Sequence, residues 1–291
     1  MNLAIITDEV SQDLARVVDW ALERGVKGLE LRSVWGKGPH LLDDREVQRI
    51  HDLIKGTGLI VCSIASPFLK CDFDRSQYEE HLSILKRCAE MAKVLGAPLI
   101  RGFTFWRQDP GPSFEEIAAH LREPAAMLGE EGLILGIENE PSTMATNGRK
   151  VRIVLDLLNS PYARAVWDPG NDVFDPEREK PYPDGYETVK DLIGHIHIKD
   201  GVWHSEENRF EAVPVGEGEV DYHGQFRALK TDGYKGWISL ETHYRPQKPL
   251  DERLAQMPRG EEFSYLGDEA SDLCLRNLRR ILEEVGVVEE H

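Results

Sequence analysis

Eight short apolar segments alternate with longer amphipathic stretches along almost the whole chain, and this alternation limits the possible folds more than any other feature. Each segment is about six residues long and rich in Ile, Val and Leu. The segments lie at 2–7, 27–32, 58–65, 98–103, 133–138, 163–168, 192–198 and 236–241. Runs of this length are too short for buried helices and favour parallel strands that are covered on both faces.

The stretches between these strands carry the spacing of amphipathic helices. They lie at 11–24, 44–56, 76–95, 113–131, 147–158, 184–190, 221–231 and 268–285. Ser76 before Glu79, and Ser113 before Glu116, have the form of capping boxes at two helix starts. Two Pro- and charge-rich stretches, 169–183 and 242–267, are expected to be long loops.

Eight strand–helix units in strict alternation predict a closed (β/α)₈ barrel, the TIM barrel. No linker and no change of composition divides the chain, so we expect a single domain over residues 1–291. An open, doubly wound sheet would need a glycine-rich phosphate-binding turn after its first strand. The sequence there is ITDEVSQD (6–13), which favours the barrel.

The composition excludes several classes of protein. The chain has 35 Lys and Arg against 52 Asp and Glu, a net charge of −17, which argues against a surface for duplex nucleic acid. No stretch reaches the roughly 18 apolar residues of a membrane span, and the N-terminus does not resemble a secretory signal. Four scattered cysteines without a C-x-x-C pair fit a reducing compartment. We therefore expect a cytoplasmic protein that binds neither nucleic acid nor membranes.

Ionisable residues end each of the last four predicted strands, on the edge where such barrels hold their active sites. They are Glu138, Asp168, His195 or His197, and Glu241. One carboxylate at a strand end is equally well explained as a helix cap or a salt bridge, but four successive ones favour a shared site. Oxygen and imidazole ligands suit one divalent ion: Mn²⁺, Mg²⁺, Co²⁺ or Zn²⁺. The two histidines face the same side of their strand, and His197 is the better ligand candidate because it lies nearer the strand end.

Five segments resemble the sugar phosphate isomerase/epimerase superfamily, whose members are xylose isomerase-like TIM barrels. They are GIENEP (136–141), WDPGN (167–171), HIHIKD (195–200), VGEGEVDY (215–222) and ISLETH (238–243). ITDEVSQDL (6–14) and GLELR (28–32) resemble the first two strands of the same group. The resemblance implies metal ligands at Glu138, Asp168, His197 and Glu241, with Glu138 and Glu241 also acting as an acid/base pair. It also makes a homo-oligomer plausible.

The same resemblance leaves the reaction open. The epimerase branch often has a histidine where this chain has Asn171, and an arginine near the position of Trp203. The leading hypothesis is a metal-dependent isomerase or epimerase that acts on a sugar or sugar derivative through an enediolate. An inosose dehydratase-like lyase is the main alternative. A non-catalytic carbohydrate-binding protein is a weaker alternative. An endonuclease IV-like phosphodiesterase is another, because strands three and four end without the histidines that the zinc cluster of that branch needs.

Further residues at or after the strand ends are candidates for contact with a carbohydrate substrate. Aromatic rings can cover sugar C–H surfaces, and cations can bind an oxygen-rich or anionic substrate. The candidates are Trp35, Lys70, Arg101, Trp106, Glu140, Asn171, His195, Lys199 and Trp203. Ordinary loop packing is the alternative for the tryptophans, and pairing with Asp8, Glu9 or Glu140 is the alternative for the cations.

Overall fold

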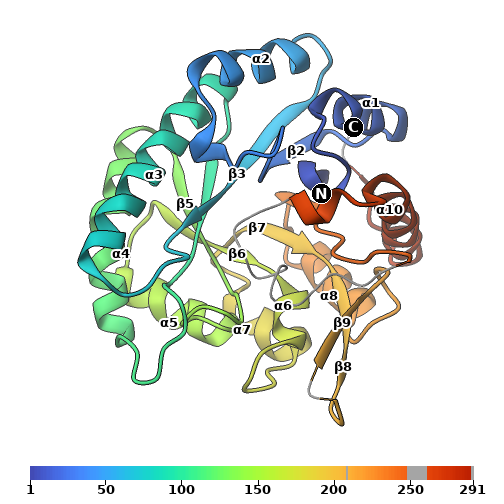
Figure 1. Cartoon of the computed structure of the whole chain (residues 1–291). Helices are drawn as coiled ribbons and strands as arrows, with labels where there is room; N and C mark the ends of the chain where they lie inside the picture. Colours follow the sequence, from blue (N-terminus) through green and yellow to red (C-terminus); the bar gives the residue numbers. More distant parts are fainter. Residues whose placement is uncertain (208, 248–260, 290–291) are drawn as a thin grey trace.

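In a computed structural model the chain forms the predicted barrel, in which eight parallel strands close in the order β1-β10-β7-β6-β5-β4-β3-β2 (Figure 1). The structure describes residues 1–207, 209–247 and 261–289. The barrel strands are β1 (Asn2–Ile6), β2 (Gly28–Leu31), β3 (Ile60–Phe68), β4 (Leu99–Gly102), β5 (Ile134–Glu138), β6 (Ala163–Trp167), β7 (Ile193–Ile198) and β10 (Trp237–Leu240). All eight predicted strands are confirmed.

Helices surround the barrel and supply the outer half of the apolar core (Figure 1). The predicted ones form as α1 (Leu14–Arg24), α2 (Asp44–Ile54), α3 (Arg75–Leu95), α4 (Phe114–Glu130), α5 (Gly148–Leu158), α7 (Tyr186–Val189), α8 (Tyr222–Thr231) and α10 (Gly267–Glu284). Shorter helical segments are η1 (Thr7–Glu9), η2 (Pro39–Leu41), α6 (Pro169–Val173), η3 (Pro181–Gly185) and η4 (Glu261–Ser264). On α1, for example, Leu14, Val17 and Ala21 are completely buried, as their spacing on one helix face requires.

Only one of the two expected capping boxes is present. Ser113 and Glu116 bond reciprocally at the start of α4, as predicted. The prediction for α3 is wrong, because Asp74 caps that helix by accepting hydrogen bonds from the backbone N–H groups of Ser76 and Gln77. The carboxylate of Asp74 also accepts a hydrogen bond from the Ser76 hydroxyl. Ser76 therefore supports the cap, but Asp74 is the capping residue.

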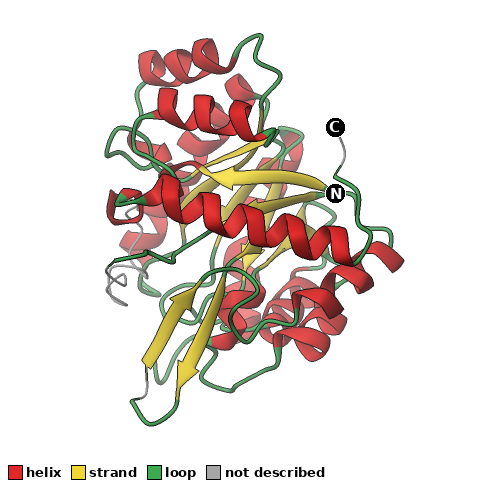
Figure 2. Ribbon diagram, turned by 90° about the vertical axis from the view of Figure 1, so that its right-hand side faces the viewer, coloured by secondary structure: helices red, strands yellow, loops and turns green. Residues whose placement is uncertain are grey.

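The long stretches after the strands contain more structure than expected. Residues 169–183 begin with helix α6 instead of a plain loop. After β7, the chain forms an antiparallel hairpin of β8 (Asp200–His204) and β9 (Arg209–Val213), which was not predicted and which extends away from the barrel (Figure 2). Of the second predicted loop, 242–267, residues 248–260 lie outside the described residues.

The two remaining structural expectations concern membranes and thiols. Among the described residues, none of the helices combines the length and apolar character that a membrane span needs. The four cysteines are all buried and none takes part in a disulfide.

Candidate metal centre and active site

Four ionisable side chains from neighbouring strands meet at the carboxyl end of the barrel. Glu138 ends β5, Asp168 follows β6, His197 lies in β7 and Glu241 follows β10. One ligand atom from each lies within 4.8 Å of all the others. His197 Nδ1 lies 3.2 Å from Glu138 Oε1, 3.8 Å from Asp168 Oδ2 and 3.5 Å from Glu241 Oε2. We call these four residues the ligand ring, and all of them are buried.

Backbone contacts at the strand ends hold the ring in place. The Asn139 side chain donates to Asp168 O (2.7 Å) and accepts from Asp168 N (2.9 Å), which ties the end of β5 to the end of β6. Asp168 is also the N-cap of α6, where Oδ1 accepts from Asn171 N while Oδ2 faces His197. The alternative prediction, a strand-end carboxylate that caps a helix, is therefore also correct for Asp168. Its carboxylate both caps α6 and faces His197.

Glu30, at the inner surface of β2, supports the histidine of the ring from below. Its Oε1 lies 3.2 Å from His197 Nε2, and its Oε2 lies 2.9 Å from His195 Nε2. In the neutral imidazole, a proton on His197 Nε2 that is donated to Glu30 leaves Nδ1 with the lone pair that faces the ring. Ser63 donates to Glu30 Oε1, and the carboxylate is completely buried.

The charges around the ring keep two of its carboxyl groups ionised. Burial alone would raise the pKa of Glu138, but Arg101 and His197 hold it down at about 2. Burial likewise opposes ionisation of Glu241, whose pKa Lys199 and His243 keep well below its usual range. The pKa of Asp168 is raised, because burial there outweighs the attraction of Lys199.

Cations from three strands face the ring. Lys199 Nζ lies 2.7 Å from Asp168 Oδ2 and 2.9 Å from Glu241 Oε2. Arg101 Nη1 lies 3.1 Å from Glu138 Oε2, and Arg32 Nη1 lies 2.5 Å from Glu241 Oε1. In the structure these side chains compensate the negative charge that the three carboxylates bring together.

The ring fits a divalent cation by its chemistry. Glu138 Oε2 and Asp168 Oδ2 are buried and face the cationic side chains of Arg101 (3.1 Å) and Lys199 (2.7 Å). Buried carboxylate oxygens are costly unless a cation faces them, and a divalent ion is a cation of the kind that these oxygens bind. Three carboxylates and one imidazole also form a donor set that suits Mn²⁺, Mg²⁺, Co²⁺ or Zn²⁺.

The residues predicted to contact the substrate lie in three different environments. Arg101, Lys199 and Asn171 touch the ring, and Asn171 Nδ2 donates to Glu138 Oε1 at 3.2 Å. His195 lies one layer deeper, where Nε2 contacts Glu30 and Ser239 Oγ (2.8 Å).

The remaining candidates lie further along the loops. Lys70 forms an ion pair with Glu140, and its Nζ lies 5.7 Å from the centre of the Trp106 ring. Trp35 packs under the Arg49 guanidinium (4.3 Å), and Trp203, in the hairpin, packs under Arg178 (4.9 Å).

Two ring neighbours, Glu30 and Arg32, were recognised in the sequence as charged residues at a strand end but were assigned no place in the site. Glu30 and Arg32 alternate by two in GLELR (28–32), which places both on one face of β2. This spacing is the sequence feature from which their common position near the ring could have been predicted. Glu9 was expected to pair with a strand-end cation, and it does pair with Arg32 (2.6 Å). Its second ion pair, with Arg245 (3.0 Å), was not predicted because the two residues are far apart in the sequence.

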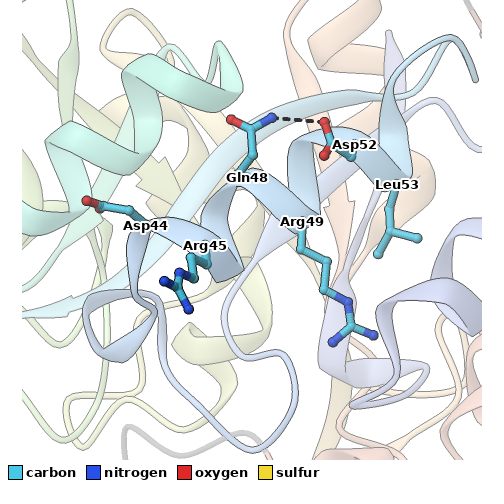
Figure 3. A pocket seen from close by; sticks show the side chains of 6 residues that line it. All are labelled: Asp44, Arg45, Gln48, Arg49, Asp52 and Leu53. Carbon is cyan, nitrogen blue, oxygen red and sulfur yellow. Dashed lines mark hydrogen bonds between the residues drawn. The ribbon is translucent and has the colours of Figure 1, made fainter.

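A hollow on the outer surface is lined by residues other than those of the ring. Asp44, Arg45, Gln48, Arg49, Asp52 and Leu53 of α2 line it (Figure 3). Gln48 donates to Asp52 across one helical turn. The residues are those of an ordinary solvated helix face, so we assign no function to the hollow.

Replacing Glu30 by glutamine is expected to weaken binding of Mn²⁺ by about 10- to 100-fold, because His197 loses the charged acceptor that orients it. The free Mn²⁺ concentration at half-saturation, measured against a competing chelator, tests this. Glu46→Gln, on the outer helix α2, is the matched control. Unchanged Mn²⁺ affinity in Glu30→Gln would show that Glu30 does not orient the ligand.

Metal binding is also expected to strengthen as pH rises. Burial alone would lower the pKa of His197, but the charges of Glu30 and Glu138 raise it well above its usual range. A protonated imidazole must lose its proton to bind a metal ion, so affinity should rise by up to about tenfold per pH unit below that pKa. Calorimetry in two buffers of different ionisation enthalpy measures the released proton. Equal heats in both buffers, and an affinity independent of pH, would contradict this expectation.

Residues 18–262 match the model of the family described as the xylose isomerase-like TIM barrel. The chain belongs to this family. The matched region contains all four residues of the ligand ring and every barrel strand except β1.

Two curated relatives are sugar epimerases by name. A segment is 26% identical over 167 residues to L-ribulose-5-phosphate 3-epimerase UlaE of Escherichia coli O157:H7, covering 55% of each chain. A shorter segment is 33% identical over 60 residues to 3-dehydro-D-guloside 4-epimerase of E. coli K12, covering 21% of this chain and 20% of the relative. The matches thus span about half, or less, of these relatives.

Solved structures share the fold at low sequence identity. The IOLI protein with a bound zinc atom aligns with a TM-score of 0.75 and 16% identity, covering 98% of this chain and 99% of that one. D-allulose 3-epimerase from Methylomonas sp., in complex with D-allulose, aligns with a TM-score of 0.72 and 19% identity, covering 97% and 96%. The probable 3-DHS dehydratase AsbF from Bacillus anthracis aligns with a TM-score of 0.68 and 18% identity, covering 83% and 92%. The fold therefore occurs with both epimerase and dehydratase chemistry.

Proposed function

We propose that the protein is a divalent-metal-dependent isomerase or epimerase that acts on a sugar or sugar derivative through an enediolate. The observation that carries this proposal is the ligand ring, in which Glu138 and Glu241 approach His197 Nδ1 within 3.2 and 3.5 Å. Two ionised carboxylates at one metal position can serve both as ligands and as acid/base groups. The epimerase names of the curated relatives support the same reaction class.

In the proposed reaction the two glutamates move a proton between carbon positions of the substrate. Glu138 or Glu241 removes the proton from the carbon next to a carbonyl group. Return of the proton to the neighbouring carbon gives isomerisation, and return to the opposite face gives epimerisation. A bound divalent ion supplies the Lewis acidity that polarises the carbonyl and adjacent hydroxyl. The low pKa values of both glutamates keep them ionised, which is the protonation state required of a proton acceptor.

Other side chains of the site hold the reacting groups. Asn171 and Arg101 fix the two oxygens of Glu138, at 3.2 and 3.1 Å respectively. Lys199 and Arg101 place positive charge where negative charge develops on the substrate oxygens. Trp106 and Lys70, which pack together beyond the ring, are proposed to line the path of the substrate.

The proposal is tested by hydrogen exchange with solvent. Mn²⁺-loaded protein is incubated in D₂O with a panel of ketoses, their 5-phosphates and inososes, and NMR follows the C–H signal next to the carbonyl. We expect loss of that signal together with an isomer or epimer as product. An enone or deoxy-keto product would assign the protein to the dehydratases instead. Turnover without deuterium in the product would exclude proton transfer through an exchanging carboxylate.

A further inference from the structure

We propose that Asp172 and Glu179 share one proton, and that this contact positions Asn139, the residue that connects the ends of β5 and β6 at the ligand ring. Asp172 lies in α6, and Glu179 lies between α6 and η3. Both would be positioning residues, because they act on the ring only through Asn139. The shared proton is independent of the proposed function, whereas the positioning role rests on the proposed metal site.

A completely enclosed carboxyl group and a half-buried one face each other behind the ring. Asp172 is 1% exposed, and its carboxyl group lies within hydrogen-bonding contact of that of Glu179. A Cβ atom on Gly185 would lie 2.5 Å from Asp172 Oδ2 and 3.0 Å from Glu179 Oε2, so both oxygens border one small space. Among the described residues, neither belongs to a group of three candidate metal ligands. A proton therefore fits this space better than a metal ion does.

The charged groups around the pair do not allow both carboxyl groups to ionise. The backbone N–H of Arg149 donates to Glu179 Oε2 at 3.3 Å, but its guanidinium pairs with Glu177 at 2.7 Å. Asp175 adds a third carboxylate nearby. Burial, followed by the charge of Glu179, raises the pKa of Asp172 well above its usual range. Asp172 is therefore the group that carries the proton, and Glu179 accepts the hydrogen bond.

Asp175, three residues after Asp172, provides the contrast. Its carboxylate accepts hydrogen bonds from Thr146 Oγ1 (2.5 Å), Asn147 Nδ2 (3.0 Å) and Glu179 N (3.1 Å). Burial opposes ionisation here too, but these hydrogen bonds lower the pKa of Asp175. Among the described residues, the Asp172 carboxyl group accepts from a single donor. Two neighbouring aspartates thus have opposite protonation states.

The proton gives each oxygen of Asp172 a different task. Oδ2 donates toward Glu179, and Oδ1 accepts from Asn139 Nδ2 at 2.8 Å. The second N–H of the Asn139 amide goes to Asp168 O (2.7 Å), and its oxygen accepts from Asp168 N (2.9 Å). Both N–H groups and the oxygen of this amide are then used, which fixes its orientation. Because Asp168 belongs to the ligand ring, the shared proton supports the geometry of the ring.

The first test compares thermal unfolding of wild type and Asp172→Asn from about pH 5 upwards. The asparagine can donate to Glu179 and accept from Asn139, but it does not titrate. Wild type takes up a proton on folding at any pH between the usual aspartate pKa and the raised one, so its stability falls as pH rises through that window. We therefore expect the melting temperature of Asp172→Asn, relative to wild type, to rise by about 2 °C per pH unit.

Asp175→Asn is the matched control, because it makes the same change in an ionised carboxylate. It should lower the melting temperature throughout the pH range without an upward trend, since an amide is a weaker acceptor for three hydrogen bonds. The same behaviour in Asp172→Asn would overturn the shared proton. Stabilisation by added Ca²⁺ that is present in wild type and absent in Asp172→Asn would overturn it too, by placing a metal ion between the two groups. Glu179→Gln also removes the shared proton and replaces Asp172→Asn if the latter does not fold.

The second test measures Mn²⁺ affinity against a competing chelator. Asp172→Ala leaves one N–H of Asn139 without its acceptor, so we expect about tenfold weaker binding, and Asp172→Asn should restore it to within about twofold of wild type. Asp156→Ala, in an exposed pair with Arg152, is the control. Asn139→Ala removes the same link and replaces Asp172→Ala if that variant does not fold.

The outcomes of this second test separate the two proposals. Wild-type affinity in Asp172→Ala would overturn the positioning role, and so would equally weak binding in Asp172→Ala and Asp172→Asn. If wild type binds no Mn²⁺, the proposed function fails together with the positioning role, and the unfolding test still decides whether the proton is shared.

Discussion

Glutamine in place of Glu138 or Glu241 is expected to reduce solvent-deuterium uptake into the substrate by about 10²- to 10⁴-fold. The amide keeps the size and one oxygen of the side chain but cannot accept the proton. If the two residues serve opposite faces of the substrate, each single variant stops the conversion. NMR of the substrate in D₂O, with Mn²⁺ at saturating concentration, measures the uptake.

Saturation with Mn²⁺ matters because both residues are also proposed metal ligands. The bound metal is therefore measured in the same samples, so that loss of proton transfer is separated from loss of the ion. Glu131→Gln is the control, since Glu131 forms an exposed ion pair with Lys93 between two outer helices. Normal deuterium uptake in both Glu138→Gln and Glu241→Gln, with metal retained, would exclude the two-glutamate mechanism.

The second large effect concerns His197. Protein purified without chelator is expected to carry about one divalent ion per chain, and His197→Ala is expected to lose nearly all of it. His197 Nδ1 is the nitrogen of the ligand ring and contacts all three carboxylates within 3.8 Å. Without this nitrogen, the three ring carboxylates remain beside their cationic neighbours, and the nitrogen ligand of the ring is lost. Elemental analysis of the two proteins measures the difference.

Melting curves complete this experiment. An ion at 100 times its dissociation constant stabilises the folded protein by about 2.7 kcal/mol, so added Mn²⁺ should raise the melting temperature of wild type but not of the variant. His197→Asn is a second variant that keeps a donor toward Glu30, and His223→Ala, on the exposed face of α8, is the control. A full complement of metal in His197→Ala would remove His197 from the site, and about three zinc ions per wild-type chain would favour the phosphodiesterase alternative.

Much of the fold follows from local patterns. Each strand is a short apolar run, and each outer helix has one apolar face. Few folds allow a chain of eight such strand–helix pairs to bury its strands and its apolar helix faces together. The predictions of local structure failed at the cap of α3, where two neighbouring side chains can both bond to the helix start, and at the β8–β9 hairpin. Asp74 lies two residues before Ser76 and caps α3 in its place. The β8–β9 hairpin has no continuous apolar run, and all of its residues except the first two of β8 are only partly buried.

Part of the candidate site was also accessible from the sequence. The barrel places the carboxyl ends of all strands on one edge, so residues that end β5, β6, β7 and β10 were expected to meet. Glu30 was recognised as a strand-end residue, but its contact with the histidines was not predicted, because its role depends on which nitrogen of His197 it contacts. That nitrogen is decided by the rotation of the ring inside the closed barrel, and no spacing along the chain encodes it.

The sequence by itself determined the alternation of strands and helices, the barrel, and the four residues at its rim that form the ligand ring. Periodicity and strand-end positions are local properties, and the barrel converts them directly into places in space. Only the tertiary structure decided that Lys199 bridges Asp168 and Glu241, that Arg101 pairs with Glu138, and that Glu30 supports both histidines. These contacts join residues that are up to 167 positions apart. Their pairing is set by the register and closure of the strands, which bring buried charges together and require each to find its partner.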